Sequence, residues 1–200
     1  MFRLDRIPGR RGLAILKITP LKIVLSGLLA VVLAGAAVAG WYVWADHDRA
    51  PAVTFSTIDG HRISLADLRG RPVMVQFWAD NCPTCRREMP QLAALYKDFH
   101  ERGLELIAVA MPYDPPNLVL KTARDQDFPY PVALDPMGKV TAAFGHISLT
   151  PTSILVAPDG SIAEKHVGAV DFSRWRKQIE NMLTTKPQAT SNKPLVADNL

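Results

Sequence analysis

The sequence is poor in the residues that build metal centres and disulfide scaffolds: its 200 residues include two cysteines and five histidines. A disulfide-rich secreted scaffold has a much higher share of cysteine. A structural zinc site takes four ligands, and no two of the histidines have the close spacing of a zinc finger. The two cysteines, Cys82 and Cys85, therefore have to be explained as a pair.

Charge is missing from one long stretch near the N-terminus. Residues 23–45 include no charged side chain, whereas the segment before them has six basic residues and one acid. A helix of this length is roughly 35 Å long, enough to cross a hydrocarbon core of about 30 Å. Because basic residues stay on the cytoplasmic side, we expect residues 1–22 to be a cytoplasmic basic segment and residues 23–45 a transmembrane signal anchor, oriented N-in.

Three other interpretations of this stretch stay open. Ala37-Val38-Ala39 has the form of a signal-peptide cleavage site. Arg10-Arg11 is a twin-arginine pair without the usual flanking residues. A buried core helix is the third interpretation. A cleaved signal exports the following domain just as an anchor does.

The basic isoelectric point does not indicate a nucleic-acid-binding protein. The whole chain has 23 basic and 19 acidic residues, and removing the N-terminal segment leaves 17 basic and 18 acidic residues from Asp46 onward. The excess positive charge thus belongs to the topology signal, and no basic surface is left for a phosphate backbone.

The remaining chain has the length of one domain with one core. We expect a linker at residues 46–51, a folded domain at 52–184 and a disordered tail at 185–200, because the tail is polar and has no periodicity. Apolar patterns within the domain predict alternating strands and helices, which argue for an α/β or mixed-sheet fold. The predicted strands are 53–57, 61–64, 73–78, 104–110, 152–157 and 161–167, and the predicted helices are 83–102, 117–126, 139–144 and 172–183. We expect Pro90 to kink the first helix, and a proline-rich segment follows at Phe128–Val132.

Cys82 stands where a buried strand meets a helix. Pro83 is favoured at the first position of a helix, so Cys82 would lie at the helix tip. Free N–H groups and the helix dipole stabilise a thiolate there, and cysteines in such settings have pKa values of roughly 3.5–7.5. Arg86 and Arg87 add positive charge. We therefore predict that Cys82 is an exposed nucleophile and that Cys85 resolves the mixed disulfide by attacking the sulfur of Cys82.

Other roles of a Cys-x-x-Cys pair fit less well. Covalent haem attachment needs histidine directly after the second cysteine, and Arg86 is there. A purely structural disulfide would close a very small loop, which gives little stabilisation. Zinc would need two further ligands.

With these residues identified, the domain resembles the thioredoxin superfamily, and specifically the TlpA/ResA-like membrane-anchored thiol–disulfide oxidoreductases. The resemblance covers roughly residues 52–183. It rests on the following motifs: Asp59-Gly60, Gly70-Arg71-Pro72, Phe77-Trp78-Ala79, Cys82–Cys85, Glu88-Met89-Pro90, Phe128–Pro136, Thr150-Pro151-Thr152 and Asp159-Gly160. It implies a thioredoxin-like fold, a central mixed β-sheet flanked by helices, with an N-terminal β-hairpin and one preceding transmembrane helix.

The resemblance also implies a set of site residues. Pro151 would follow a cis peptide bond and lie against a redox disulfide of Cys82 and Cys85, with the backbone of Thr150 free to pair with an extended substrate. A trans proline at the start of an edge strand is the alternative. Trp78 would form both core and site wall.

Glu88 is the third candidate catalytic residue. A half-buried carboxylate three residues after Cys85 would take its proton during resolution. The alternative is a surface glutamate beside Arg86 and Arg87. Gln76 and Asn81 depart from the pattern: thioredoxin has a buried aspartate at the first position, and many relatives have an aromatic residue at the second. Because Gln76 stands in place of that aspartate, the group that accepts the proton of Cys85 must be Glu88 or water.

The resemblance implies a reductase of protein disulfides in the bacterial cytoplasmic membrane, with its catalytic domain on the periplasmic side and no cofactor. Apocytochrome c and copper-site cysteines are the implied substrates, and a membrane thiol transporter of the DsbD/CcdA kind is the implied electron donor. Two alternatives stay open. One is a peroxiredoxin-like peroxidase. The other is a Sco-like Cu(I) carrier with His146 or His166 as third ligand.

Overall fold

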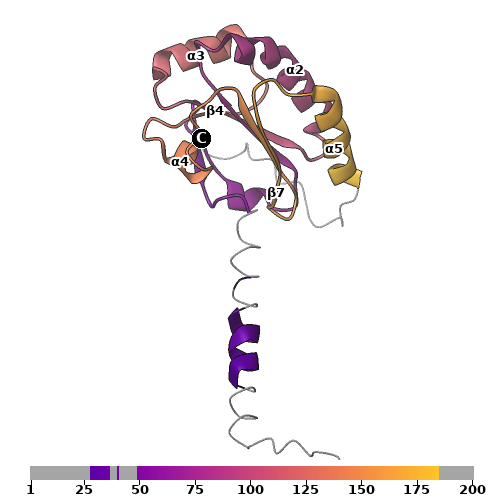
Figure 1. Cartoon of the computed structure of the whole chain (residues 1–200). Helices are drawn as coiled ribbons and strands as arrows, with labels where there is room; N and C mark the ends of the chain where they lie inside the picture. The colour runs from indigo at the N-terminus through magenta and orange to yellow at the C-terminus, as the bar shows by residue number, and fades with distance from the viewer. Residues whose placement is uncertain (1–27, 37–39, 41–48, 185–200) are drawn as a thin grey trace, which may run out of the picture. The chain divides into compact units, whose positions relative to one another are not determined.

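The computed structural model describes residues 28–36, Gly40 and residues 49–184 (Figure 1). The chain divides into two compact units, residues 1–47 and 48–200. In the first unit, residues 28–36 form a helix with exposed side chains. Among the described ranges no helix is long and apolar enough to cross a membrane. The predicted basic segment, most of the predicted span at 23–45 and the predicted tail at 185–200 lie outside the described residues.

The second unit contains a seven-stranded mixed sheet. The strand order is β2-β1-β5-β4-β3-β6-β7. The strands are β1 (Thr54–Thr57), β2 (Arg62–Ser64), β3 (Val73–Trp78), β4 (Glu105–Ala110), β5 (Val132–Leu134), β6 (Thr152–Val156) and β7 (Ile162–Val167), and the helices are the short 3₁₀ helix η1 (Leu65–Leu68), α2 (Pro83–Phe99), α3 (Pro116–Asp125), α4 (Lys139–Ala143) and α5 (Phe172–Thr184). The predicted α/β class and the central strands are confirmed.

The leading hairpin forms where the sequence predicts it. Gly60 has a φ of 87°, a conformation that glycine adopts without a steric cost and that the turn after Asp59 requires. The Thr57 hydroxyl donates a hydrogen bond to Asp59, and the Thr57 amide donates one to the His61 carbonyl at 2.9 Å. β1 then pairs with β5, so the hairpin extends the main sheet.

Strand β5 was not predicted from the sequence. It begins at Val132, the last residue of the predicted proline-rich segment, and pairs parallel with β4 and antiparallel with β1. Prolines at 129 and 131 remove backbone donors and hide the strand pattern. The strand forms because two neighbouring strands offer hydrogen-bond partners on its two sides, which the local sequence does not reveal.

Helix α2 begins at Pro83 as predicted and continues through Pro90. It ends at Phe99, three residues before the predicted end at Arg102. Residues 100–103 form turns, and Gly103 has a φ of 113°. The extra turn before Gly103 is the reason that the apolar pattern overestimated the length of the helix.

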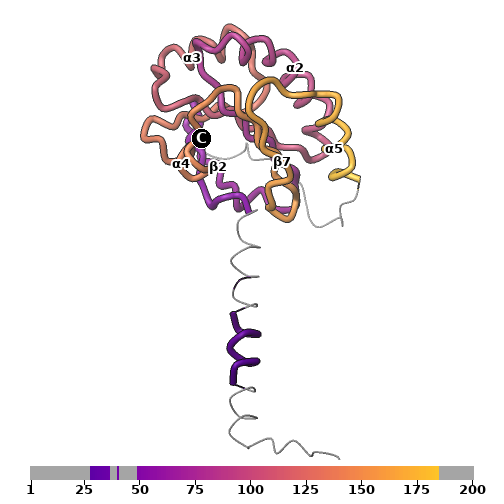
Figure 2. The backbone as a smooth tube through the Cα atoms, in the orientation of Figure 1, coloured from indigo at the N-terminus to yellow at the C-terminus, as the bar shows by residue number. Residues whose placement is uncertain are grey.

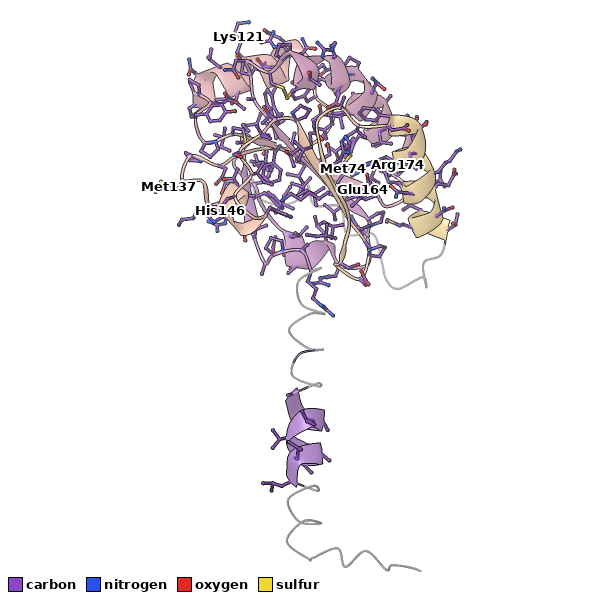
Figure 3. The ribbon with its side chains drawn as sticks, in the orientation of Figure 1. Met74, Lys121, Met137, His146, Glu164 and Arg174 are labelled. Atoms are coloured by element: carbon purple, nitrogen blue, oxygen red, sulfur yellow. A yellow bond between two sulfur atoms is a disulfide. The ribbon has the colours of Figure 1, made fainter. Side chains whose placement is uncertain are left out.

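Helices α2 and α5 cover the same face of the sheet and lie side by side (Figures 1 and 2). An ion pair joins them, from Arg176 to Asp98 at 2.6 Å, and Arg102 in the turn after α2 pairs with Glu180 of α5 at 3.3 Å. Arg174 and Glu164, labelled in Figure 3, link α5 to strand β7. Helix α5 therefore ties the terminal hairpin to the helix that begins with the cysteine pair.

The opposite face of the sheet packs against the segment around α4. Side chains alternate along β3, so Phe77 points away from α2. Its ring meets Phe144 edge to face, with centroids 5.6 Å apart. The sheet is thus covered on both faces, and β3 and β4 are buried along their whole length.

The topology brings distant segments to one edge of the sheet. Strands β3, β4 and β5 are parallel, so their carboxyl ends lie together. β6 is antiparallel to β3, and Thr152 is paired with Phe77. The segment before β6, which contains Thr150 and Pro151, therefore reaches the edge from which the chain enters α2.

Candidate active site

The cysteine pair stands at the start of helix α2, as predicted. Cys82 is the N-cap residue and Pro83 occupies the first turn. The structure joins Cys82 and Cys85 in a disulfide, with Cα atoms 5.3 Å apart. The Cys82 sulfur accepts a hydrogen bond from the Cys85 amide at 3.1 Å. An N–H group of the first helical turn therefore points at this sulfur.

Cys82 is less exposed than the sequence predicts. Its exposed fraction is 8%, against 2% for Cys85. The prediction of a freely exposed helix tip is wrong. The residues before the helix form a turn, in which the Cys82 amide donates to the Ala79 carbonyl at 3.1 Å. Cys82 nevertheless remains the more accessible of the two sulfur-bearing residues.

The two arginines after the pair have partners of their own. Arg86 donates to the carbonyl of Asp80 at 3.0 Å and to its carboxylate at 3.2 Å. Arg87 donates to the Thr84 hydroxyl at 2.9 Å. The positive charge of Arg86 is thus partly balanced by Asp80, which the sequence analysis did not anticipate.

Asp80 also fixes the segment between β3 and α2. The Asp80 amide donates to the Asp114 carboxylate at 3.0 Å. The Asp80 carboxylate accepts a hydrogen bond from the Thr122 hydroxyl. Burial raises the pKa of Asp114, and the nearby Asp80 charge adds to this, while the hydrogen bond from the Asp80 amide lowers it. The sequence analysis missed Asp114 and Thr122. The sequence position of Asp114 could have indicated this contact. Asp114 follows the carboxyl end of β4, and the cysteine segment follows the carboxyl end of the parallel strand β3.

Glu88 is buried on the inner face of α2, with an exposed fraction of 4%. One carboxylate oxygen accepts a hydrogen bond from the Val170 amide at 2.6 Å. The other oxygen, Oε2, has no partner among the residues the structure describes. Burial raises the pKa of Glu88, opposed by the Val170 bond and by the charges of His166 and Arg87. The alternative of a surface glutamate is wrong, and the predicted half-buried carboxylate is in fact almost fully buried.

The peptide bond between Thr150 and Pro151 is cis, as the resemblance implies. Pro151 is buried, and its carbonyl accepts a hydrogen bond from the Gly168 amide at 2.8 Å. Thr150 is half-buried. The structure places both residues at the edge of the sheet that leads into the cysteine pair.

Trp78 is the last residue of β3 and is fully buried in the core. Its ring meets Phe128 edge to face, with centroids 5.9 Å apart. Two positions before it, Gln76 accepts a hydrogen bond from the Ser153 hydroxyl. A buried amide therefore stands where thioredoxin has an aspartate.

The described part of the chain holds no group of three or more His, Cys, Asp or Glu side chains that would bind a metal. His146 lies beside α4, away from helices α2 and α5 (Figure 3). The His166 ring nitrogen Nε2 lies 2.8 Å from the carbonyl oxygen of Ala169.

Comparison with known proteins places this site in a family. The AhpC/TSA family matches residues 47–165. The thiol-disulfide oxidoreductase ResA of Bacillus cereus is 32% identical over 135 residues, which cover 67% of this chain and 74% of the relative. The ResA protein of Bacillus subtilis is 31% identical over 142 residues, which cover 71% and 76% of the two chains.

Solved structures give the same result. A thiol:disulfide interchange protein from Chlorobium tepidum aligns with a TM-score of 0.62 and 27% identity, over 68% of this chain and 95% of that one. The thioredoxin domain of a thiol-disulfide oxidoreductase from Bacteroides vulgatus aligns with a TM-score of 0.58 and 27% identity, over 68% and 95%. The chain belongs to the AhpC/TSA family of thioredoxin-like proteins and is a thiol–disulfide oxidoreductase of the ResA type.

Proposed function

We propose that this thiol–disulfide oxidoreductase works as a reductase of protein disulfides at the outer face of the bacterial cytoplasmic membrane. Cys82 is the nucleophile, Cys85 is the resolving thiol and Glu88 accepts the proton of Cys85. The observation that supports these roles best is the hydrogen bond from the Cys85 amide to the Cys82 sulfur at the helix start.

The two sulfurs receive different roles because their surroundings differ. An amide directed at the Cys82 sulfur and the dipole of a 17-residue helix stabilise negative charge there. Cys82 is also the more exposed of the pair, so a substrate sulfur reaches it first. The Cys82 thiolate is therefore the group that attacks an incoming disulfide.

The reaction balances in two exchanges. The Cys82 thiolate attacks one substrate sulfur, a Cys82–substrate bond forms, and the other substrate sulfur leaves with the electron pair and takes a proton. Cys85, once deprotonated, attacks the Cys82 sulfur, and the second substrate sulfur leaves. The substrate gains two electrons and two protons, and the protein returns to its disulfide form.

Glu88 suits the deprotonation of Cys85. It lies three residues further along the same helix, so both residues share one face of α2. Oxygen Oε2 is available as the acceptor, since the Val170 amide occupies the other oxygen and no described residue bonds to Oε2. Burial raises the pKa of Glu88 and so brings the carboxyl closer to the acidity of a thiol, which favours proton transfer.

Thr150, Pro151 and Trp78 complete the proposed site. Pro151 has no N–H to give, and its carbonyl is already bonded to Gly168, so the backbone of Thr150 is the group we expect to pair with an extended substrate. Trp78 forms the inner wall beneath the disulfide.

The proposed location rests on the sequence of the first unit. The basic residues at 1–22 and the uncharged stretch at 23–45 support an uncleaved N-in anchor, with the catalytic domain on the periplasmic side. The proposed electron donor is a membrane thiol transporter of the DsbD/CcdA kind. The proposed substrates are apocytochrome c and copper-site cysteines, so the protein would act in cytochrome c maturation or copper-site assembly.

Trapping with Cys85→Ser tests the roles and the partners together. Without a resolving thiol, the mixed disulfide at Cys82 persists, and the attached protein is identified by mass spectrometry after non-reducing separation. Cys82→Ser is the matched control and should trap nothing. Equal trapping by the two variants would contradict the assignment of roles.

The direction of electron flow and the location need a second measurement. The redox state of the cysteine pair is read in intact cells with a membrane-impermeant maleimide. We expect labelling of a reduced pair from outside, and its loss when the thiol transporter is deleted. A pair that stays oxidised in both strains would indicate an oxidase, and a pair labelled only after lysis would contradict the proposed side of the membrane.

A further inference from the structure

A small cavity lies between helix α2 and the sheet, on the inner side of the disulfide. The space open to the centre of a water molecule is about 10 Å³, which is at the lower limit for holding one water. Cys85 and Met89 line it from α2, Gln76 and Trp78 from β3, and Phe128 and Tyr130 from the segment before β5. The cavity therefore borders Cys85, the proposed resolving cysteine.

Two hydrogen-bond donors on the walls of this cavity lack a partner among the described residues. They are the amide nitrogen Nε2 of Gln76 and the indole nitrogen Nε1 of Trp78. The exposed fractions of these residues are 1% and 2%. Buried polar atoms in folded proteins nearly always bond to a protein group or to an ordered water. Two unpaired donors around a water-sized space are thus a specific feature of this site.

The two ends of the Gln76 amide have different surroundings. The Ser153 hydroxyl donates to its oxygen Oε1, and its nitrogen Nε2 has no partner among the described residues. Gln76 and Trp78 are two positions apart on β3, so both point to the face that α2 covers. Both residues line the cavity from the sheet, and Cys85 lines it from the helix.

We propose that this cavity holds one water molecule that accepts hydrogen bonds from Gln76 Nε2 and Trp78 Nε1 and donates one to the sulfur of Cys85 in the reduced protein. The bonding capacities match, because water has two lone pairs for the two donors and keeps its own O–H groups for the sulfur. This inference rests on the proposed role of Cys85 as the resolving thiol.

The water acts on one redox state more than on the other. A disulfide sulfur is a weak acceptor, whereas a thiolate is charged and accepts strongly. The hydrogen bond therefore strengthens when Cys85 becomes a thiolate, the form that attacks Cys82. Gln76 and Trp78 are positioning residues in this scheme, since they touch the water and not the reacting substrate.

Other titratable groups near the cavity do not supply this effect. Tyr130 lines the cavity, and burial raises the pKa of its phenol, so it stays neutral. Glu88 lies one turn further along α2 and holds the Val170 amide. Glu88 removes the proton of Cys85, and the water stabilises the charge that remains.

The first test is the pKa of the Cys85 thiol in the reduced protein, measured by NMR from the ¹³Cβ shift of labelled cysteine. Trp78→Phe removes one donor. Gln76→Leu combined with Ser153→Ala removes the other without leaving the serine hydroxyl unpaired. Each of these two variants should raise the pKa of Cys85 by about one unit. At a pH below the pKa, the thiolate fraction would then be about tenfold smaller. Met89→Leu alters an apolar wall alone and should leave the pKa unchanged.

The second test observes the water itself. In the ¹⁵N-labelled parent, we expect a nuclear Overhauser effect between the Trp78 indole proton and a long-lived water, and its loss in the Gln76→Leu/Ser153→Ala variant. An unshifted Cys85 pKa in the donor variants, or the absence of the water signal in the parent, would overturn the inference. If the double variant does not fold, Trp78→Phe and the parent signal decide the matter.

The two proposals fail separately. Trapping by the Cys85→Ser variant reports the exchange function and does not depend on the water. A shifted Cys85 pKa with no trapped partner would support the water site and overturn the proposed function. A trapped partner together with an unshifted Cys85 pKa would support the proposed function and overturn the water site.

Discussion

Two buried glutamates lie near the two ends of helix α2, and their surroundings differ. Glu88 lies in the second turn, and Glu105 begins strand β4 beside the last turn. Burial raises the pKa of both. Glu105 is surrounded by donors: the Leu106 amide at 3.4 Å, the Tyr96 hydroxyl at 3.5 Å and His100 at 4.0 Å all approach one of its oxygens. Glu88 has one short bond to Val170 and one unpartnered oxygen within the described residues.

The difference shows that a raised pKa alone does not identify a catalytic group. Structural networks and active sites both bury carboxylates. What distinguishes Glu88 is a free acceptor oxygen on the helix face that carries Cys85. Glu105 has neither a cysteine nearby on its strand nor a place at the catalytic edge of the sheet, so we assign it to the support of the helix end.

The largest expected effect comes from removing the carboxylate near Cys85. Glu88→Gln keeps the size of the side chain and an oxygen for the Val170 amide, but it cannot accept a proton. Because a positioned base contributes about 10²–10⁴-fold, the resolution step should slow by about 10²-fold at neutral pH. Stopped-flow measurement of mixed-disulfide decay reads this step directly.

Glu105→Gln is the matched control at the other end. It removes a buried carboxylate with the same direction of pKa shift, yet the resolution rate should stay within about twofold. Equal slowing in the two variants would mean that buried charge in general, and not a base beside Cys85, sets the rate.

A smaller effect is expected in the pH dependence of stability. Burial raises the pKa of Glu105, so the folded state holds its proton more tightly than the unfolded chain. The stability that this group contributes is full below the ordinary value of 4.5 and is lost as the pH rises through the folded pKa. Glu105→Gln should therefore gain stability relative to the parent as the pH rises.

Urea unfolding of the parent and of Glu105→Gln across the acidic and neutral range measures this difference. Glu88→Gln should shift in the same direction, because burial also raises the pKa of Glu88. A difference in free energy of unfolding that does not change with pH would contradict the assigned burial of these carboxyl groups.

The smallest effect is expected for the hydroxyl of Tyr96. Tyr96→Phe removes the hydroxyl, which lies 3.5 Å from a Glu105 oxygen and 3.3 Å from His100 Nε2, and leaves the ring stacked on His100. We expect a loss of about 1 kcal/mol in the free energy of unfolding, with no change in the rate of thiol exchange. A clear loss of exchange activity with normal stability would show that the two ends of the helix are functionally coupled.

The site could be predicted from the sequence where its signal is local. Cys82, Pro83 and Cys85 lie within four positions, and proline at the helix start together with a preceding apolar strand fixes their placement. The hairpin turn at Asp59-Gly60 is equally local. The cis bond before Pro151 followed from the family resemblance and not from the residues alone.

The parts that the sequence did not reveal depend on contacts between distant segments. Glu88 is buried because the chain 82 positions later brings the Val170 amide to it. Asp80 meets Asp114 because β3 and β4 end at the same edge. The same holds for β5, which pairs with two distant strands although prolines stand directly before it in the sequence.

The central claim is that the start of helix α2 makes Cys82 the acidic and reactive sulfur. The most direct test is the rate of iodoacetamide alkylation of the reduced protein as a function of pH, with the modified residue identified by peptide mass spectrometry. The account predicts that Cys82 reacts first and that its rate has an inflection well below about 8.5, the ordinary cysteine value. An inflection of Cys82 at or above that value, or faster alkylation of Cys85, would contradict it.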